Sequence, residues 1–191
     1  MSSALRPRVT LKLATSLDGK IALADGQSKW ITGPESRAEV HKMRAAHEAI
    51  LTGVGTIIAD DPLFTARTDP VPERQPDLIV LDRSGRMPMG AQVFNAANRQ
   101  VILRAAKTIE TALVGYERIM IEAGAQIAAA AIKAGIVDRI EWFRAPKLIG
   151  GEGIDVIAGL GLETLDKAPI FQRVGVVERG ADLQESYERI H

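Results

Sequence analysis

The residues best suited to bind a ligand follow two hydrophobic runs of the sequence. Ala49–Leu51 leads into the turn TGVGT at 52–56, and Ile119–Ile121 leads into the turn EAGAQ at 122–126. In an open parallel sheet, ligands bind at the carboxyl ends of strands, and helix N-termini there present free N–H groups to phosphates. Both turns are therefore candidate phosphate sites.

Each turn also has a purely structural interpretation. The first turn is not a Gly-x-Gly-x-x-Gly fingerprint, because position 58 is Ile. Thr56 either donates its hydroxyl to a phosphate or caps a helix. In the second turn, the small residues at 128–131 indicate either a ligand over the helix start or tight packing of the helix on the sheet.

Three arginines are candidates for holding phosphate groups. Arg44 and Arg67 can each pair bidentately with a substrate phosphate, although a solvated surface position is the ordinary alternative. Arg83 follows the strand DLIVL and an Asp, where a Rossmann-like fold meets the adenosine ribose. An Arg at that position favours the 2′-phosphate of NADP over NAD.

The acid–base candidates are few. Asp60 is a candidate acid or ligand anchor, although paired Asp residues before Pro are also ordinary turn chemistry. The histidines at 41, 47 and 191 lack the spacing of a metal site, so we expect them at surface or packing positions and predict no metal. The chain has no cysteine, which excludes thiolate nucleophiles and disulfides.

The stretch 10–33 pairs an aromatic ring with a hydroxyl. Ser28 and Trp30 are two residues apart, so in an extended segment both would point the same way. That arrangement suits a flat ligand, and the alternative is a Trp that fills the core.

Alternating strands and helices are predicted to position these groups. Thr32 and Glu35 fit a capping box for a helix that runs to about Arg44. A brief helical turn is expected at 57–60 and a helix from Gly124 to about Gly135. Strands are expected at 9–14, 49–53, 77–81, 100–103, 119–122, 138–143, 171–177 and 183–190. The pattern predicts an α/β fold with a mostly parallel sheet and antiparallel C-terminal strands at one edge.

The length, net charge and apolar runs of the chain exclude some classes of function. The 191 residues predict one domain, with two small ones also compatible. Lys plus Arg and Asp plus Glu are both 24, so the zero net charge gives no case for nucleic acid. Apolar runs are too short for a membrane span, and the N-terminus lacks a signal-peptide core. We expect a cytoplasmic protein.

The motifs resemble the reductase domain of bacterial riboflavin biosynthesis, the RibD C-terminal family. The resemblance covers about residues 6–189, and it rests on SLDGKI, SKWIT, the Arg44 helix, ILTGVGTIIADDP, IEAG and APKLIGG. It implies a dihydrofolate-reductase-like three-layer α/β fold and a homodimer. The implied activity is reduction of 5-amino-6-(5-phosphoribosylamino)uracil to its ribitylamino product with NADPH, by hydride transfer to ribose C1.

The resemblance also assigns residues. Contacts with NADP are implied for Ala14, Trp30, Thr56, Asp60, Gly124, Ala125, Gln126, Ile127, Ala128, Ala129 and Ala130. Arg83, singled out by its place after the strand DLIVL, is added to this set. Contacts with the phosphorylated pyrimidine are expected from Ser28, Arg44, Phe64, Arg67 and Glu122. The proton donor is expected to be Asp60, or a water that it holds, with Glu122 as the second candidate.

The sequence departs from the family at a few positions. Ala125 and Gln126 stand where many relatives have a second Gly and a Ser or Thr, and Arg83 stands where relatives often have Ser. The zinc deaminase domain that many relatives carry needs a Pro-Cys-x-x-Cys site, so a single reductase domain over 1–191 is predicted.

Three other functions remain open at this point. The same fold suits a reductase of the still-aminated 2,5-diamino-6-ribosylaminopyrimidinone phosphate or of dihydrofolate. A third possibility is a non-catalytic NADP-binding protein. Arg44 and Arg67 favour a phosphorylated sugar over a pterin.

Overall fold

The computed structural model describes residues 6–190, and His191 lies outside the described residues. The helices are α1 (Pro34–Ala46), α2 (Val54–Asp60) and α3 (Ala125–Lys133). The strands are β1 (Arg8–Thr15), β2 (Lys20–Ala22), β3 (Ala49–Gly53), β4 (Asp77–Leu81), β5 (Val101–Arg104), β6 (Arg118–Ile121), β7 (Arg139–Arg144), β8 (Ile154–Asp155), β9 (Phe171–Arg179) and β10 (Asp182–Arg189). Short 3₁₀ turns cover Gln92–Asn95, Glu110–Ala112 and Leu165–Lys167.

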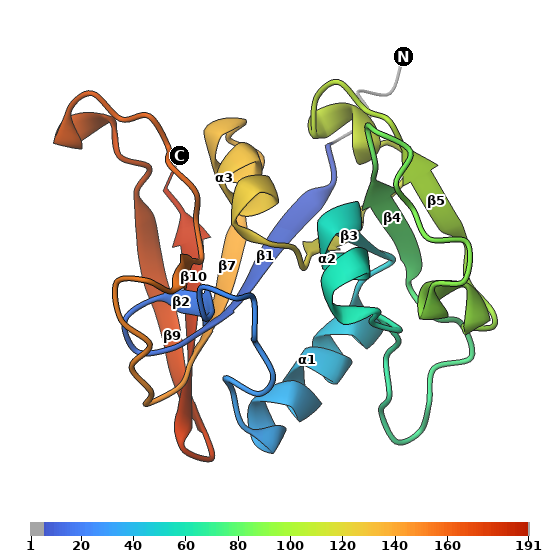
Figure 1. The fold of residues 1–191 in the computed structure, drawn as a ribbon, viewed down its shortest axis with the longest axis horizontal. Coiled ribbons are helices and arrows are strands. Elements are labelled where there is room, and N and C mark those ends of the chain that lie inside the picture. Colours follow the sequence, from blue (N-terminus) through green and yellow to red (C-terminus); the bar gives the residue numbers. More distant parts are fainter. Residues whose placement is uncertain (1–5, 191) are drawn as a thin grey trace. The chain divides into compact units, whose positions relative to one another are not determined.

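Hydrogen bonds join the main-sheet strands in the order β5-β4-β3-β6-β1-β7-β10-β9, and Figure 1 shows the elements in sequence colours. Strand β3 pairs in parallel with β4 and β6, and β4 pairs in parallel with β5. Strand β10 pairs antiparallel with β7 and β9. The predicted α/β class, with a mostly parallel sheet and antiparallel C-terminal strands, is confirmed.

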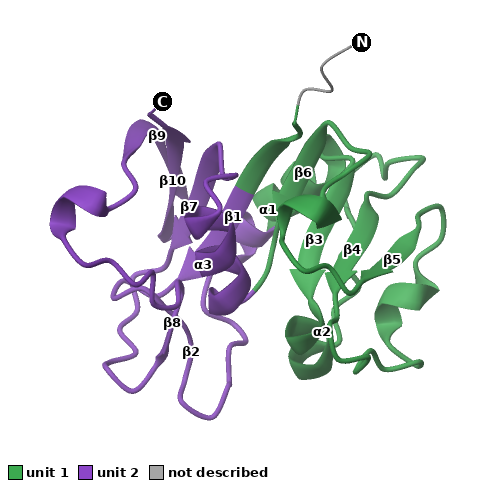
Figure 2. Cartoon of the chain, turned by 90° about the horizontal axis from the view of Figure 1, so that it is seen from above, with its two compact units in different colours: residues 1–10, 38–123 green, residues 11–37, 124–191 purple. Residues whose placement is uncertain are grey.

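The chain divides into two compact units, drawn in different colours in Figure 2. Among the described residues, the first unit holds 6–10 and 38–123, and the second holds 11–37 and 124–190. All five residues of β3 are buried, as are the first four of β4. Such continuous burial is typical of strands covered on both faces.

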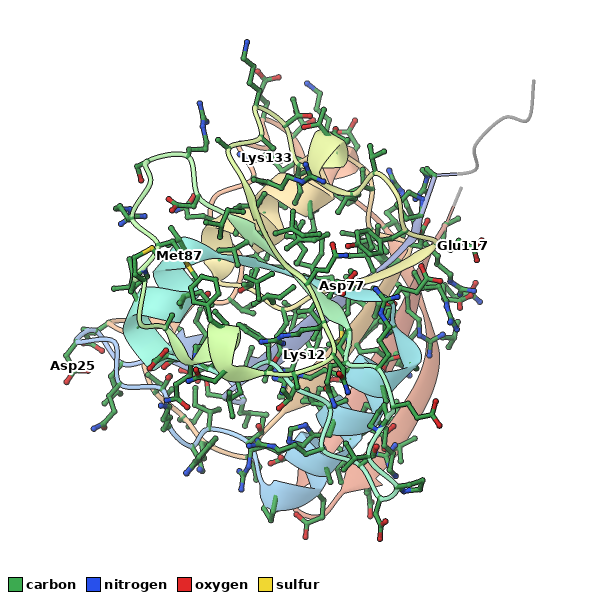
Figure 3. All side chains as sticks on the ribbon, turned by 90° about the vertical axis from the view of Figure 1, so that its right-hand side faces the viewer. Lys12, Asp25, Asp77, Met87, Glu117 and Lys133 are labelled. Carbon is green, nitrogen blue, oxygen red and sulfur yellow. The ribbon has the colours of Figure 1, made fainter. Side chains whose placement is uncertain are left out.

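A buried carboxylate in the first unit, Asp77, accepts several hydrogen bonds at the start of a strand; it is labelled in Figure 3. Asp77 begins β4 and receives hydrogen bonds from the Gln100 N–H, the Tyr116 hydroxyl and the Arg74 guanidinium. Burial first, and then the hydrogen bond that its hydroxyl donates to Asp77, raises the pKa of Tyr116 to about 12. These contacts lie at the start of β4, so they stabilise the sheet at the end of the strand away from its carboxyl end.

In the second unit, α3 packs through its smallest side chains. Ala128, Ala129 and Ala131 are buried, which confirms the packing interpretation for these positions. The unit also contains a sheet of two strands, β2 and β8. The sequence pattern missed this pair, because strands of three and two residues are too short for alternation to be recognised.

The start of α1 differs from the predicted capping box. The helix begins at Pro34, and the Arg37 N–H bonds to the Gly33 carbonyl, so Gly33 rather than Thr32 holds the cap position. The Asp182 carboxylate, 3% exposed, accepts hydrogen bonds from the Gly33 N–H and the Ser36 hydroxyl, both at 2.6 Å. A side chain distant in sequence thus caps the helix, which a local pattern cannot reveal.

The short helix α2 also begins earlier than predicted. It starts at Val54 with Gly53 as its N-cap, so the interpretation of Thr56 as a helix cap is wrong. It ends as predicted before Asp61-Pro62. Asp61 takes a left-handed conformation, with φ 42°, and its N–H bonds to the Ile57 carbonyl. Among residues 6–190, no helix is long and apolar enough to span a membrane.

We predict that Asp182→Ala lowers the free energy of unfolding by about 2–3 kcal/mol, because two donors lose a buried charged acceptor. Urea denaturation measures the change. Glu163→Ala, which removes an exposed partner of Lys167, is the control and should change stability by less than about 0.5 kcal/mol. Equal stability of the two variants would contradict the role of Asp182 as a cap.

Candidate functional site

The first unit contains a bidentate ion pair at the carboxyl end of β6. Arg44 lies in the last turn of α1 and Glu122 directly follows β6. Arg44 donates from Nε at 3.0 Å and from a terminal nitrogen at 2.9 Å to the two carboxylate oxygens of Glu122. The side chains are 13% and 14% exposed. The interpretation of Arg44 as a solvated surface residue is therefore wrong.

The same guanidinium also bonds to the loop that follows α2, which covers residues 61–76. Arg44 donates its third bond to the Thr65 carbonyl at 3.1 Å, and its guanidinium carbon lies 5.4 Å from the centre of the Phe64 ring. Phe64 is buried and takes φ 52°, a conformation that few side chains adopt. The contact network of Arg44 therefore joins three residues that the sequence assigns to the substrate: Arg44, Phe64 and Glu122.

Two residues that the sequence did not single out hold this loop in place. Arg99 donates to the carbonyls of Leu63 at 2.7 Å and Phe64 at 3.1 Å. Gln75 bonds to both the N–H and the carbonyl of Ala66, at 2.6 and 3.0 Å. Burial lowers the pKa of Arg99 to about 10. Neither residue lies in a motif, so the sequence carries no signal for either role.

Arg67 is exposed and lies within this loop of residues 61–76. Its Nε and one terminal nitrogen lie 3.2 and 3.1 Å from Nε2 of His41, on α1. The described structure therefore pairs Arg67 with an imidazole, whereas it pairs Arg44 with a carboxylate. This difference leaves the charge of Arg67 better suited to meet an anion.

The remaining first-unit candidates lie on α2 and after β4. Thr56 is half-buried within α2, and Asp60 is the half-buried last residue of that helix. Arg83 is exposed in the loop after β4. That loop is ordered by Asp82, whose carboxylate accepts the N–H groups of Arg86 and Met87.

In the second unit, Trp30 is 64% exposed, so its interpretation as a core residue is wrong. The Arg37 guanidinium lies 4.4 Å from the centre of its ring, in a cation–π contact. Lys147 donates to the Trp30 carbonyl at 2.8 Å. Lys29 and Trp30 form a turn and Ser28 is half-buried, so the expected extended geometry for Ser28 and Trp30 is also wrong.

The segment SLDG at 16–19, between β1 and β2, is joined by hydrogen bonds to the Gly-rich loop at 146–153. The Asp18 carboxylate accepts hydrogen bonds from the Ser16 hydroxyl at 2.6 Å, the Gly150 N–H at 2.7 Å and the Ile149 N–H at 3.1 Å. The Ser16 bond, followed by the Gly150 bond, lowers the pKa of Asp18 to about 2. This network fixes the loop after Ala14, which is half-buried near the end of β1.

The start of α3 has some of the features of an anion-binding site. Gly124 is its N-cap, with extended backbone and no side-chain cap hydrogen bond. A Cβ built at Gly124 meets nothing within 4 Å, so the backbone is open to close approach. Gln126 and Ala130 are exposed, whereas Ala128 and Ala129 are buried. Side-chain contacts with a ligand from the buried pair are incompatible with this packing.

Both described histidines bond through their rings. His47 contacts the Met43 carbonyl at 2.7 Å and the Thr10 hydroxyl at 3.1 Å. Within residues 6–190, no group of three or more His, Cys, Asp or Glu side chains is arranged to hold a metal ion.

Comparison with known proteins identifies the family. The profile of the RibD C-terminal domain matches residues 7–184. The chain belongs to this family. It is 36% identical over 181 residues to the riboflavin biosynthesis protein RibD of Mycobacterium tuberculosis, covering 93% of this chain and 53% of that protein. It is 35% identical over 210 residues to RibD of Aquifex aeolicus, covering 96% and 58%. The chain thus spans little more than half the length of these relatives.

Solved structures agree with this assignment. RibD of Acinetobacter baumannii superposes with a TM-score of 0.87 at 29% identity, covering 97% of this chain and 59% of that chain. Dihydrofolate reductase of Enterococcus faecalis superposes with a TM-score of 0.64 at 15% identity, covering 97% and 98%. The second likeness shows the fold alone, and it confirms the dihydrofolate-reductase-like architecture.

We predict that Glu122→Ala lowers the free energy of unfolding by about 2–4 kcal/mol, because it leaves the mostly buried Arg44 without its carboxylate. Glu122→Gln keeps one acceptor and should cost less. Lys42→Ala, which removes the exposed partner of Glu39 on the same helix, should change stability by less than about 0.5 kcal/mol. Urea unfolding of all three variants tests this order, and a Glu122→Ala value as small as the Lys42→Ala value would disprove it.

Proposed function

We propose that the chain reduces 5-amino-6-(5-phosphoribosylamino)uracil to its ribitylamino product with NADPH. A RibD-family structure from Thermotoga maritima, described as a diaminohydroxyphosphoribosylaminopyrimidine deaminase and 5-amino-6-(5-phosphoribosylamino)uracil reductase, superposes with a TM-score of 0.83 at 28% identity. The observation that carries the proposal is the arrangement of Arg44, Arg67 and Glu122 around one loop in the first unit. Two guanidinium groups favour a phosphorylated sugar over a pterin, because the pterin ring itself carries no anionic group.

The two arginines take different parts in this proposal. Arg44 already bonds to Glu122 and Thr65 through all three of its nitrogens. It therefore orients the Glu122 carboxylate as an acceptor for the polar groups of the substrate and adds positive charge beside the phosphate. Arg67 is exposed and becomes the direct phosphate ligand, because its bond to a neutral ring leaves its charge available. Phe64 and Ser28 complete the proposed substrate contacts.

The residues present fit a dinucleotide cofactor at the start of α3. Gly124 has no side-chain cap and open space at its Cβ position, and a helix N-terminus favours phosphate. We assign direct contact to the first turn, from Gly124 to Ile127, in which Gln126 is exposed and the other residues are half-buried, and to Ala130, while Ala128 and Ala129 support the helix from the core. Further contacts are assigned to Ala14, Trp30, Thr56, Asp60 and Arg83, with the Arg83 guanidinium at the 2′-phosphate.

The protein's part in the reaction is to bind, orient and supply a proton. NADPH, when bound, supplies the hydride that reduces C1 of the opened ribose. A proton must then reach the substrate nitrogen or oxygen. Asp60, or a water that it holds, is the first candidate donor. Glu122, whose carboxylate accepts two hydrogen bonds from Arg44, is the second.

The oligomeric state, the location and the domain content are also predictions. We propose a homodimer, a cytoplasmic location and a single reductase domain over 1–191. These follow from the family resemblance and the composition.

The direct test is NADPH oxidation with 5-amino-6-(5-phosphoribosylamino)uracil, run beside its 2,5-diamino precursor and dihydrofolate. Turnover of the first compound alone supports the proposal. Preference for the diamino compound would place reduction before deamination and correct the substrate. Activity on dihydrofolate alone, or NADPH binding without turnover of any of the three compounds, would overturn the proposal.

We predict that Asp60→Asn lowers kcat roughly 10²–10⁴-fold, the contribution of a positioned general acid. The matched control is Asp61→Asn at the next residue. The Asp61 carboxylate accepts the Gln92 N–H, and Asn tolerates its left-handed backbone. Single-turnover rates should fall in the first variant and stay within about twofold in the second. Unchanged turnover in Asp60→Asn would exclude Asp60 as the donor.

A further inference from the structure

His41 contacts the loop at both of its ring nitrogens, and the mechanism above gives it no part. Its Nδ1 lies 3.0 Å from the Thr65 carbonyl oxygen. Its Nε2 lies 3.2 Å from Nε of Arg67 and 3.1 Å from a terminal nitrogen of the same side chain. The ring therefore bridges the loop backbone and the Arg67 guanidinium.

These contacts decide which nitrogen carries the proton. A guanidinium has donors and no acceptor, so Nε2 must offer its lone pair to Arg67. The proton of a neutral ring then sits on Nδ1, where it is donated to the Thr65 carbonyl. The Arg67 N–H also lies near Nδ1, at 3.3 Å, but the Thr65 oxygen is the closer partner. A doubly protonated ring would point an N–H at the guanidinium.

The surroundings of the ring favour this neutral form. The charged groups that face it are Arg44 on the same helix, Arg67 on the loop and Glu122 after β6. Burial first, and then the charges of Arg44 and Arg67, lower the pKa of His41 below its ordinary value of 6.5. The imidazole is therefore an uncharged acceptor at neutral pH.

We propose that His41 is a positioning residue, whose neutral ring holds the Arg67 guanidinium in place for the phosphate group of the substrate. The inference rests on the proposed function, in which Arg67 is the phosphate ligand. An arginine side chain loses considerable rotamer freedom when it is ordered, and His41 fixes it before the substrate arrives. A carboxylate at this position would also order Arg67, but it would compete with the phosphate for the guanidinium. An uncharged acceptor avoids that competition.

The kinetic test uses two variants and a matched control. His41→Leu should raise the KM for the phosphorylated substrate about tenfold, with little change in kcat. That factor corresponds to the free energy of about one hydrogen bond to a charged group. His41→Gln keeps an oxygen acceptor for Arg67 and should recover most of the affinity. His47→Leu, on the same helix with different ring partners, should leave KM unchanged. Equal KM changes in His41→Leu and His47→Leu would overturn the proposal.

A double-mutant cycle separates positioning from a general structural effect. If His41 acts through Arg67, His41→Leu should have no further effect on KM in the Arg67→Ala background. An undiminished tenfold effect in that background would show that His41 does not act through Arg67.

The pH dependence of KM provides an independent readout. As the pH falls below the lowered pKa of His41, the ring gains a proton and repels Arg67, so the wild-type KM should rise. The phosphate of the substrate also titrates near pH 6, but that ionisation is shared by His41→Gln. The acid limb should therefore be steeper in the wild type than in His41→Gln, and parallel profiles would contradict the proposal.

A spectroscopic measurement distinguishes failure of this inference from failure of the proposed function. The ¹⁵N shifts of the His41 ring in the ligand-free protein should show a protonated Nδ1 and a bare Nε2, and Arg67→Ala should raise the pKa of the ring. Ribose 5-phosphate, with ribose as the control, should perturb these shifts. An Nε2–H ring would overturn the positioning role even in an active enzyme. The expected tautomer in a protein that does not reduce the pyrimidine would instead reject the proposed function.

Discussion

The candidate substrate site depends on the hydrogen bonds of one guanidinium group. Arg44 bonds to the Glu122 carboxylate after β6 and to the Thr65 carbonyl in the loop after α2. Because these bonds use three different nitrogens of a rigid planar group, α1, β6 and the loop are fixed with respect to one another within the first unit. The left-handed backbone of Phe64 is held by two guanidinium groups, since Arg99 donates to its carbonyl and Arg44 donates to the carbonyl of the next residue.

The other contacts of this loop follow from the same constraint. Arg99 and Gln75 satisfy the Leu63, Phe64 and Ala66 backbone groups that no strand or helix bonds. Buried backbone polar groups need such partners, and long side chains supply them here. The two arginines at this loop differ in the charge of their partners. Arg44 pairs with a carboxylate, whereas Arg67 pairs with an imidazole, so we propose Arg67 as the direct ligand of the anion and Arg44 as a second positive charge near it.

The sequence predicted the parts of the fold that local pattern determines. The buried run DLIVL became β4, and the antiparallel C-terminal strands expected at 171–177 and 183–190 became β9 and β10. The cap of α1 was misplaced because its acceptor, Asp182, is far away in the sequence. The strands β2 and β8 were too short to show a period. Trp30 was ambiguous because residue type alone does not distinguish an exposed ring from a buried one.

The candidate site was predictable to a smaller extent. The motifs singled out Arg44, Arg67 and Glu122, and in the structure Arg44 bonds both to Glu122 and to the loop that carries Arg67. The contributions of His41, Arg99 and Gln75 were not predictable, because each acts through a backbone carbonyl or a guanidinium that becomes its neighbour only in the folded chain. Residues that bind through motifs can be recognised in a sequence, whereas residues that hold those motifs in place depend on tertiary contacts.

We propose that the loop after α2 recognises a phosphate on the substrate of a reductase. The most direct measurement compares kcat/KM of the wild-type protein for the phosphorylated pyrimidine with kcat/KM for the same compound lacking its phosphate. We predict a preference of about a hundredfold for the phosphorylated compound, which corresponds to the free energy of two charge-assisted hydrogen bonds. Equal values for the two compounds would contradict it.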